Sequence, residues 1–315
     1  MRDKKILLTL AIPTNGVTEW VLPVLESIFS QAEENDDFEV VITDNGKNEA
    51  FRDKITEYQK RHQNLFYKKT DAYLFLNQIE AFKEARGEFI KFVNHRTVLR
   101  PGMLKYLLDF ARDNIEEKPI TYFMNGNGTG QKRIEICNNF DDFVRTMSYR
   151  SSWSGGICCW KTDLHKIIET GVHSTLYPHI AFIFTEKNRS RYIVDNTRLF
   201  EELSVEKEKK AKYDLFFAFG VEYLGILCNL LRNRDISPET FLKIKKDQKS
   251  FIVELYIKFV ILKKKASFDT SSFQTSLEVF YSYSSIKWAV FPYLIKYTFQ
   301  KLKKRISSKE GDSEI

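Results

Sequence analysis

The stretch Phe38-Glu-Val-Val-Ile-Thr-Asp-Asn-Gly46 decides the fold class, because a β-rich run passes directly into a polar turn. The earlier run Ile6–Ile12 has the same form: it is continuously apolar and ends in Pro13-Thr14-Asn15. Such a continuous apolar run is typical of a strand that is covered on both faces. Two strands of this kind near the start of the chain predict a buried parallel sheet.

Helical patterns alternate with these strands. We expect helices over Thr18–Gln31, Glu49–Arg61 and Asp71–Ala85, the last capped by Gly87, and from Pro101-Gly102 to Ala111; further strands are expected over Asn64–Lys68 and Phe89–Val93. This alternation predicts an α/β fold with a doubly wound, mostly parallel sheet. Ligands of such sheets bind beyond the carboxyl ends of the strands. The residues expected to converge there are Pro13, Thr14, Asn15, Asp44, Asn45, Asn94, His95 and Arg96.

The second half of the chain is less regular. Short helices are expected over Phe140–Tyr149 and near Leu164–Thr170, followed by one long helix over Lys207–Arg234 and another that starts at Ser237-Pro238. Ser is a favourable N-cap and Pro is well suited to a first helical turn. We therefore expect an α/β domain over 1–200, a basic amphipathic helical appendage over 201–306 and a polar tail over 307–315.

The positive charge lies in the C-terminal third. The chain carries +7 in total, while residues 241–306 contain 13 Lys and one Arg against four acidic residues, which is +10 and leaves −3 elsewhere. Trp288, Phe291 and other aromatic residues alternate with these lysines. We favour docking on an anionic membrane surface. A helical core with a solvated lysine face is the alternative, and nucleic acid is not expected, because no recognition motif is present.

The compartment follows from features that the sequence lacks. The four cysteines show no Cys-x-x-Cys pair or metal spacing and are expected to be reduced thiols. We see no signal peptide and no uncharged run of the roughly 18 residues that span a bilayer. The expected location is cytoplasmic, peripheral on the inner face of the plasma membrane.

Six elements in register carry a family resemblance over residues 4–110. They are Ala11-Ile-Pro-Thr-Asn-Gly16, Leu25-Glu-Ser-Ile-Phe-Ser-Gln31, Glu39-Val-Val-Ile-Thr-Asp-Asn-Gly46, Asn77, Ala85-Arg-Gly-Glu-Phe-Ile-Lys-Phe-Val93 and Val98-Leu-Arg-Pro-Gly-Met-Leu104. Together they resemble the family 2 glycosyltransferases with a GT-A fold, which use nucleotide sugars to build bacterial polysaccharides. Ser154-Gly-Gly-Ile157 and Leu176-Tyr-Pro-His-Ile180 look like the subset related to abequosyltransferases.

The resemblance implies donor-binding roles. Asp44 would accept a hydrogen bond from the nucleoside of the donor, and Pro13, Thr14 and Asn15 would line the nucleotide. Asp44-Asn45-Gly46 could instead be a plain turn. Asn77 corresponds to a helix residue that faces the donor, although it could equally cap or bridge backbone.

The family's metal-binding Asp-x-Asp position reads Asn94-His95-Arg96 in this chain. Mg²⁺ and Mn²⁺ need hard oxygen ligands, and a guanidinium repels cations, so we expect no metal and no other cofactor. Our hypothesis is that Arg96, together with His95, neutralises the departing diphosphate in place of the ion. The alternative is that Arg96 is a solvated turn residue of a degenerate enzyme.

Inverting transfer also needs a general base for the acceptor hydroxyl. The family places an acidic residue near the start of a helix after the acceptor loop, and in that neighbourhood this chain has His179, just after Pro178. Histidine titrates near neutral pH and can serve as the base, while a structural histidine is the alternative. Asp163 and His173 are weaker candidates.

These features predict an inverting glycosyltransferase that moves a sugar from a nucleotide-sugar donor to a lipid-linked saccharide acceptor, in capsule or O-antigen synthesis. A catalytically silent homologue that binds nucleotide sugars as a scaffold is the alternative, supported by the missing Asp-x-Asp. A nucleotidyltransferase would need acidic metal ligands and a Gly-rich phosphate loop near the first strand, and neither is present.

Overall fold

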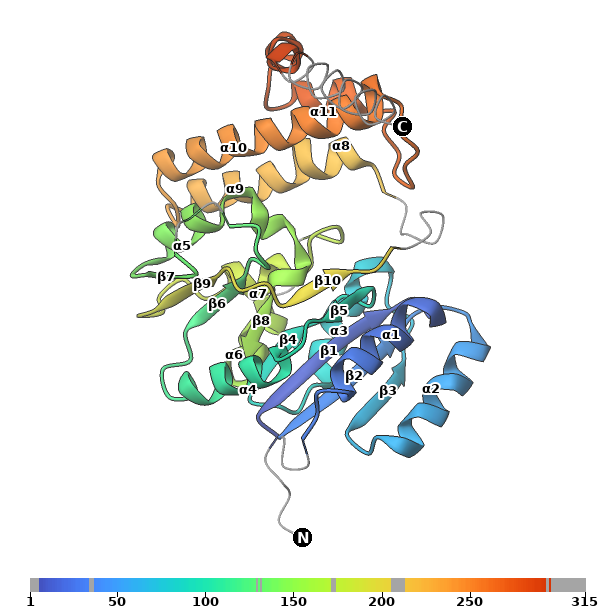
Figure 1. The fold of residues 1–315 in the computed structure, drawn as a ribbon. Coiled ribbons are helices and arrows are strands. Elements are labelled where there is room, and N and C mark those ends of the chain that lie inside the picture. Colours follow the sequence, from blue (N-terminus) through green and yellow to red (C-terminus); the bar gives the residue numbers. More distant parts are fainter. Residues whose placement is uncertain are drawn as a thin grey trace, which may run out of the picture. The chain divides into compact units, whose positions relative to one another are not determined.

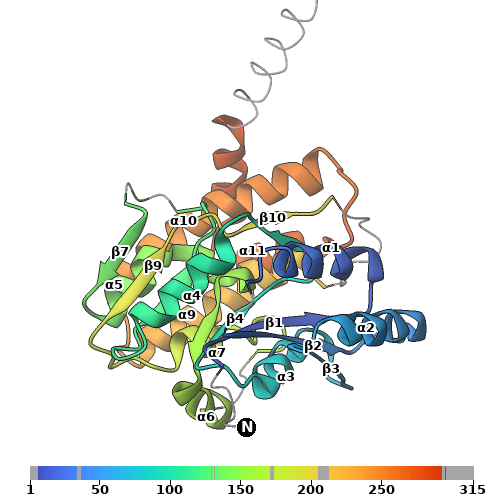
Figure 2. The same ribbon diagram turned by 60° about the horizontal axis from the view of Figure 1, so that its bottom comes forward.

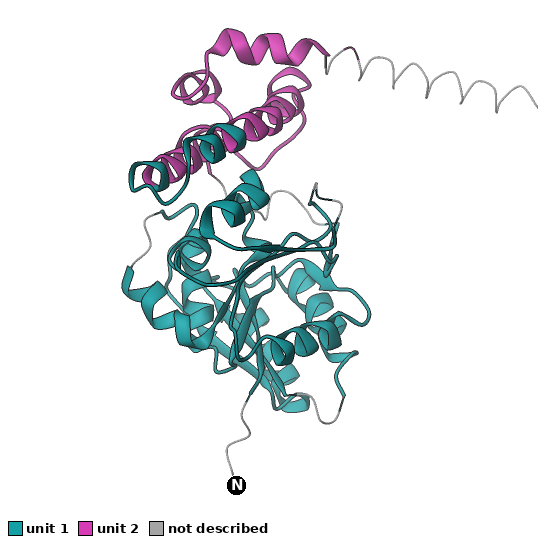
Figure 3. Cartoon of the chain, turned by 90° about the vertical axis from the view of Figure 1, so that its left-hand side faces the viewer, with its two compact units in different colours: residues 1–210, 230–243 teal, residues 211–229, 244–315 magenta. Residues whose placement is uncertain are grey.

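The structure is a computed structural model that describes residues 6–33, 37–128, 130, 132–170, 174–204, 213–292 and 295. The chain divides into two compact units (Figure 3). Unit 1 comprises residues 1–210 and 230–243, and unit 2 comprises residues 211–229 and 244–315.

The central sheet of unit 1 has five strands in the order β3-β2-β1-β4-β8 (Figure 1). Four are parallel and β8 is antiparallel to β4; their bounds are β1 Leu8–Thr14, β2 Phe38–Asp44, β3 Leu65–Lys69, β4 Phe89–Phe92 and β8 Cys158–Trp160. Every residue of β2 is buried, as the apolar run predicted. The expected mostly parallel α/β sheet is confirmed, and its architecture is GT-A-like.

Helices cover both faces of this sheet. One face carries α1 (Thr18–Phe29), α2 (Glu49–Arg61) and α4 (Met103–Asp113), and the other carries α3 (Asn77–Glu84) (Figure 2). Leu8, Leu10 and Ile12 of β1 pack into the core cluster shared with α1, α2 and α4. Because side chains alternate along a strand, the residues between them face α3. Burial on both faces is what fixes this doubly wound arrangement.

Two predicted helix boundaries are wrong near α3. The helix begins at Asn77, after the short 3₁₀ turn η1 (Leu74–Leu76), rather than at Asp71. The reason is that the Asn45 side-chain amide donates to the carbonyls of Ala72 and Leu74, at 2.8 and 3.1 Å, and holds that segment outside a helix.

Gly87 does not cap α3, because the C-cap is Ala85. Gly87 packs against β1 instead: a Cβ there would lie 2.6 Å from the backbone nitrogen of Thr9. Likewise Pro101 precedes α4 rather than opening it. The N-cap is Gly102, whose φ of 79° is a left-handed conformation that glycine adopts without strain.

The rest of unit 1 contains two small sheets and several short helices. One sheet has the order β6-β9-β7, with β6 Ile120–Phe123, β9 Tyr192–Asp195 and β7 Ile134–Cys137; the other pairs β5 (Thr97–Leu99) with β10 (Phe200–Glu202). The helices are α5 Phe140–Met147, η2 Ser148–Ser152, η3 Ser154–Gly156, α6 Lys161–Thr170 and α7 Ile180–Phe184.

Residues 230–243 hold the turn between α9 (Tyr223–Arg232) and α10 (Pro238–Tyr256) within unit 1. Ser237 donates from its backbone and its hydroxyl to the Asp141 carboxylate, at 2.8 and 2.9 Å, and Lys187 pairs with Asp235. The Ser237 hydroxyl also accepts from the Thr240 N–H at 3.2 Å. This contact confirms the predicted N-cap.

Unit 2 is helical. Its described elements include α8 Leu215–Phe217, the π-helical stretches η5 Ala218–Glu222 and η6 Ile257–Ile261, most of α9 and α10, α11 Phe273–Glu278 and a helical stretch over 283–292. The predicted start of a helix at Lys207 lies outside the described residues. Within the described residues a helix starts at Leu215, because the Asp214 side chain accepts from the Phe217 N–H and caps it.

One helix among the described residues, Leu215–Arg232, has the length and the apolar character that a membrane crossing needs. Its mean hydropathy is 1.5 over 18 residues, and 44% of that window is buried within the molecule. Core helices of soluble proteins meet the same two criteria.

Candidate functional site

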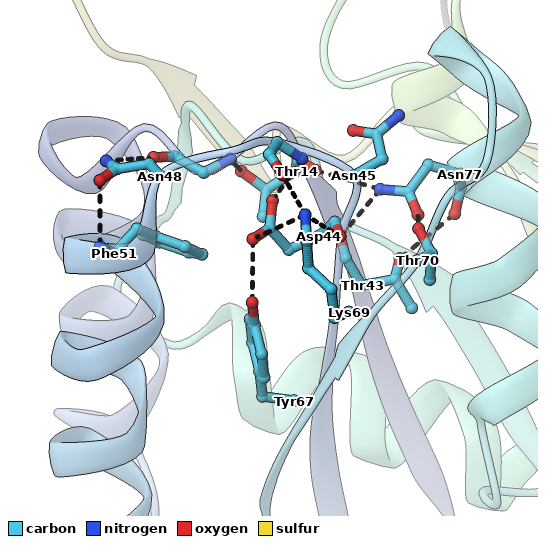
Figure 4. Close-up of polar contacts among 12 residues, drawn as sticks. Thr14, Thr43, Asp44, Asn45, Asn48, Phe51, Tyr67, Lys69, Thr70 and Asn77 are labelled. Atoms are coloured by element: carbon cyan, nitrogen blue, oxygen red, sulfur yellow. Dashed lines mark hydrogen bonds and ion pairs between the residues drawn. The ribbon is translucent and has the colours of Figure 1, made fainter.

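Three parallel strands end side by side at the carboxyl edge of the central sheet. Thr14 of β1 is in register with Asp44 of β2, and Asp44 is in register with Lys69 of β3 (Figure 4). The loops beyond them are tied together, because the Asn45 N–H donates to the Thr14 carbonyl at 3.1 Å. The predicted convergence of Thr14 and Asp44 on one edge is therefore present.

The Asp44 carboxylate is held by the protein itself and is only 1% exposed. One oxygen accepts from the Gly46 N–H at 2.7 Å, and the other accepts from the Tyr67 hydroxyl at 2.9 Å and lies 3.8 Å from Lys69 Nζ. Lys69 also donates to the carbonyls of Asp44 and Gly46. Asp44 thus anchors the turn, and Tyr67 and Lys69 lie at the same edge as the proposed donor site.

Two glycines permit the close approach of the first two strand ends. A Cβ on Gly46 would lie 2.0 Å from the Asn15 carbonyl oxygen, and Gly16 has a φ of 77° and sits against the Asp44 carboxylate. Asn15 itself is exposed at the tip of its loop, and Pro13 is half-buried. The Asn48 side chain donates to the Gly16 carbonyl at 2.9 Å and caps α2.

Asn77 bridges the strand ends from the start of α3. Its amide nitrogen donates to the carbonyls of Thr14 and Thr43, at 3.1 and 2.8 Å, and its side-chain oxygen accepts from the Thr70 hydroxyl at 2.8 Å (Figure 4). The side chain is buried. Of the two roles that the sequence left open, backbone bridging is the one that these contacts describe.

The turn after β4 carries Asn94, His95 and Arg96. The Asn94 side-chain oxygen accepts from the Arg96 N–H at 3.2 Å, and its carbonyl accepts from the Thr97 N–H at 2.9 Å. The Arg96 carbonyl accepts from the Leu203 N–H at 2.9 Å, which joins the turn to the chain beyond β10. The Arg96 backbone is therefore fixed on both sides.

His95 connects this turn to β1. Its Nδ1 lies 2.8 Å from the Thr14 hydroxyl, and its ring packs edge-on against Trp20, with the centroids 5.1 Å apart. Burial, and next the charge of Arg96, lower the pKa of His95 to about 3. His95 is therefore neutral near pH 7 and supplies no positive charge to a diphosphate, so that the charge in our hypothesis falls to Arg96 alone.

Metal ligands are few at this edge. The Asn94 side-chain oxygen is already used within its turn, and the Asp44 carboxylate is engaged on both oxygens. Within the described residues no group of three or more His, Cys, Asp or Glu side chains is placed to hold a metal ion.

His179 precedes α7 and is 3% exposed. Its Nε2 lies 3.2 Å from the Ser151 carbonyl, so that Nδ1 is the acceptor nitrogen, and Nδ1 has no hydrogen-bond partner among the described residues. Burial lowers the pKa of His179 to about 4. Of the weaker candidates, Asp163 pairs with Arg189 at 2.6 Å, and His173 lies outside the described residues.

A cavity of about 460 Å³ lies elsewhere in unit 1, beside β7 and α5. None of the predicted site residues lines it; the charged residues that do are Glu135, Asp142, Arg145 and Lys243. Acidic and basic groups are equally represented, so that the lining favours no ligand charge.

Tyr67 and Lys69 are site residues that the sequence did not single out. From the sequence we assign no role to the end of the expected short strand over Asn64–Lys68. The signal was available, because every parallel strand of a doubly wound sheet presents its carboxyl end at the same edge.

Comparison with known proteins gives a family match over the part of the chain that contains this edge. Residues 9–148, which include the strand ends and the turn Asn94–Arg96, match the model of glycosyl transferase family 2. No curated protein sequence matches the chain.

Solved structures show the same fold. The chain is similar to the crystal structure of S. aureus TarS 1-349, with a TM-score of 0.50 and 16% identity over 82% of this chain and 73% of that one. It is similar to S. aureus TarS, with a TM-score of 0.52 and 17% identity over 87% of this chain and 46% of that one. A third similar structure is the mannosyltransferase PcManGT from Pyrobaculum calidifontis in complex with GDP-Man and Mn²⁺, with a TM-score of 0.52 and 12% identity over 95% and 80%. At such identities the likeness concerns the fold.

Proposed function

We propose that this protein is an inverting family 2 glycosyltransferase that moves a sugar from a nucleotide-sugar donor to a lipid-linked glycan in the synthesis of a cell-surface polysaccharide. The observation that carries the proposal is the family match over 9–148, which covers the edge where Thr14, Asp44 and the turn Asn94–Arg96 meet. Placement in the abequosyltransferase-like subset, and in capsule or O-antigen synthesis, is part of this proposal.

The donor nucleotide would bind over the loops that follow β1 and β2. Asn15 is exposed there, and Lys69 has a side chain that is 47% exposed at the same edge. Asp44 and Asn77 are engaged within the protein, so their part in donor binding is to hold these loops in shape. Direct contact with the nucleoside then falls to the exposed groups and to the backbone around Gly46.

In the transfer step the acceptor hydroxyl oxygen attacks the anomeric carbon, and the bond from this carbon to the diphosphate oxygen breaks. The nucleoside diphosphate leaves with the bonding electron pair, and the hydroxyl proton passes to a base. Arg96 would balance the charge on the diphosphate, since guanidinium stays protonated and matches phosphate oxygens with two donors. The PcManGT structure is a complex with GDP-Man and Mn²⁺, and in this chain the guanidinium would take the place of such an ion.

His179 is the proposed base, acting through Nδ1. A pKa of about 4 makes it neutral and able to accept a proton, but weakly basic. Its burial means that the acceptor hydroxyl must reach Nδ1 by displacing part of the surrounding chain.

A catalytically silent scaffold that binds nucleotide sugars is the second candidate. It is favoured by the absence of a carboxylate at Asn94-His95-Arg96 and by the low basicity of the buried His179. Such a protein would bind a donor without consuming it.

The decisive experiment combines binding with turnover. The purified chain is screened against nucleoside diphosphates by thermal shift, since a bound ligand raises the melting temperature. Release of the nucleoside diphosphate from the matching nucleotide sugar is then measured with lipid-linked saccharide acceptors. Binding with release supports the transferase, binding without release supports the scaffold, and failure to bind any nucleotide contradicts both.

The proposed membrane contact rests on the helical stretch 283–292 of unit 2. Ile286 and Val290 are buried, whereas Trp288 is 78% exposed and Phe291 is 64% exposed. The exposed residues Trp288, Phe291 and Ile295 are spaced i, i+3 and i+7 and so share one helix face.

An exposed aromatic face within a region of net charge +10 fits the surface of an anionic bilayer. The remainder of 285–305 lies outside the described residues. We place the protein on the cytoplasmic face of the plasma membrane, where it would meet a lipid-linked acceptor.

A further inference from the structure

Lys91 is a fully buried lysine in the central strand β4. Its Nζ donates three hydrogen bonds to backbone carbonyls, those of Phe92 at 2.9 Å, Gly155 at 2.7 Å and Ile157 at 3.1 Å. The rings of Phe123 and Phe200 lie over it, each with its centroid 5.4 Å away. Among the described residues no carboxylate pairs with it.

Stability does not explain a lysine at this position. A buried ammonium gives up its hydration, and lysine is seldom fully buried without an acidic partner. An apolar side chain of similar length would fill the same space without that cost. The lysine therefore has a use other than filling the core.

The three carbonyls belong to two segments that border the proposed site. Phe92 is the last residue of β4, two residues before Asn94, and β4 leads into the turn that carries Arg96. Gly155 and Ile157 belong to the segment Trp153–Ile157, whose glycines are required by packing: a Cβ on Gly155 would lie 2.1 Å from the Trp153 ring. The ammonium thus joins these two segments directly.

A second core group holds the same segment further back. The Tyr122 hydroxyl lies 2.6 Å from the carbonyls of both Arg150 and Trp153. Ser151, between them, offers its carbonyl to His179 Nε2. A continuous series of contacts therefore runs from the strand end, through Lys91 and the glycine segment, to His179.

From this arrangement we infer that Lys91 is a positioning residue for the proposed transfer reaction: its ammonium group fixes the segment 151–157, and with it His179, against the strand end that carries Arg96. The expected effect on kcat rests on the proposed function. The expected fixing of the segment 151–157 rests on the hydrogen bonds alone.

The contact is sensitive to pH because the ammonium has three hydrogens for three carbonyls and the neutral amine has two. Burial lowers the pKa of Lys91 to about 7, so the third hydrogen bond is lost as the pH rises through neutrality. The titratable group that faces it is the Cys158 thiol, opposite in register on β8. Burial raises the pKa of that thiol to about 12, so it stays neutral in this range.

The test compares Lys91→Met, which keeps the length and removes the donor, with Leu10→Met as a matched core control, since Leu10 is in register with Lys91 on β1. We expect Lys91→Met to lower kcat at least tenfold and to leave the KM for the donor within about twofold. The kcat of the wild type should fall above about pH 7, and this fall should be absent in Lys91→Met. Leu10→Met should keep the wild-type profile.

Hydrogen exchange supplies a readout that needs no activity. In the wild type the amides of 153–157, corrected for intrinsic rates, should lose protection from about pH 6 to about pH 8 relative to those of β1. If Lys91→Met does not fold, this wild-type measurement decides. Loss of protection without any transferase activity would retain the structural role and reject the proposed function. Unchanged protection across this range, or a wild-type kcat profile in Lys91→Met, would overturn the inference.

Discussion

The Thr14 hydroxyl lies 2.8 Å from Nδ1 of His95, so the end of β1 is hydrogen-bonded to the turn that follows β4. These residues are 81 positions apart in the chain. Their contact brings the loop proposed to bind the nucleotide next to the turn that contains Arg96, the residue proposed to balance the diphosphate. Burial, and next the charge of Arg96, keep this imidazole neutral near pH 7 by lowering its pKa to about 3.

The low pKa of His95 predicts sensitivity to acid. The unfolded chain binds a proton near pH 6.5 and the folded chain only near pH 3, so this stabilisation is complete above pH 6.5 and is lost as the pH falls toward about 3. His95→Gln should flatten the fall in unfolding free energy over this range, by on the order of a few kcal/mol.

The measurement is urea unfolding at several pH values. His165→Gln is the control, because the His165 side chain is 83% exposed. His179, whose pKa is also lowered, should leave part of the slope in place. A slope equal to that of the wild type in His95→Gln would contradict the neutral, buried state of this ring.

Arg96 should be essential for transfer if its guanidinium replaces a metal. Arg96→Gln should lower kcat about 100-fold, the usual scale for losing one electrostatic contact to a developing negative charge. A chelator should leave the wild-type rate unchanged. Arg100→Gln is the matched control, since Arg100 pairs with Glu201 at 3.3 Å on the adjoining strand. If a chelator abolishes the activity of the wild type, the proposal that the Arg96 guanidinium replaces a metal ion is rejected.

Gly46→Ala should separate the first two strand ends. The new Cβ would meet the Asn15 carbonyl at 2.0 Å, so the loops must part. We expect a loss of about 1–3 kcal/mol of unfolding free energy and weaker binding of the nucleotide. Gly225→Ala, in α9, is the control: nothing lies within 4 Å of its Cβ, and the helix should be stabilised slightly. Tight nucleotide binding by Gly46→Ala would place the donor elsewhere.

Asn77→Ala distinguishes backbone bridging from donor contact. Removal of the side chain leaves the Thr14 and Thr43 carbonyls without this donor and should lower the unfolding free energy by about 2–3 kcal/mol. Thermal unfolding without ligand is the measurement. Asn64→Ala, which loses one bond to the Phe38 carbonyl at the start of β2, is the milder control. Unchanged stability with impaired nucleotide binding would show direct donor contact instead.

The exposed aromatic face predicts binding to vesicles. Trp288→Ser combined with Phe291→Ser should weaken co-sedimentation with anionic liposomes at low salt about 10- to 100-fold, because both side chains are exposed and available for burial in lipid. Val279→Ser, an exposed position outside the helical stretch 283–292, should bind like the wild type. If the wild type fails to sediment with these vesicles, the membrane proposal is rejected.

Local patterns were sufficient for the sheet. The apolar runs that became β1 and β2 are covered on both faces, and a run of that kind has few alternatives in an α/β chain. The predicted boundary of α3 was wrong because a side chain from a distant part of the sequence hydrogen-bonds the backbone there. Asn45, 29 residues away from Leu74, holds the carbonyls that would have extended α3, and no pattern within residues 71–85 shows this contact.

The sequence by itself determined the alternation of strands and helices, the positions of the strand ends and the turn Asn94–Arg96 without a carboxylate, because periodicity and residue chemistry are local properties. Tertiary structure alone decided the protonation of His95, Lys91 and His179 and the engagement of Asp44 and Asn77. The reason is that pKa values and hydrogen-bond partners depend on burial and on neighbours far along the chain. Lys91 shows this most clearly: in the sequence it interrupts an apolar strand, and in the fold it joins two segments that lie 64 residues apart.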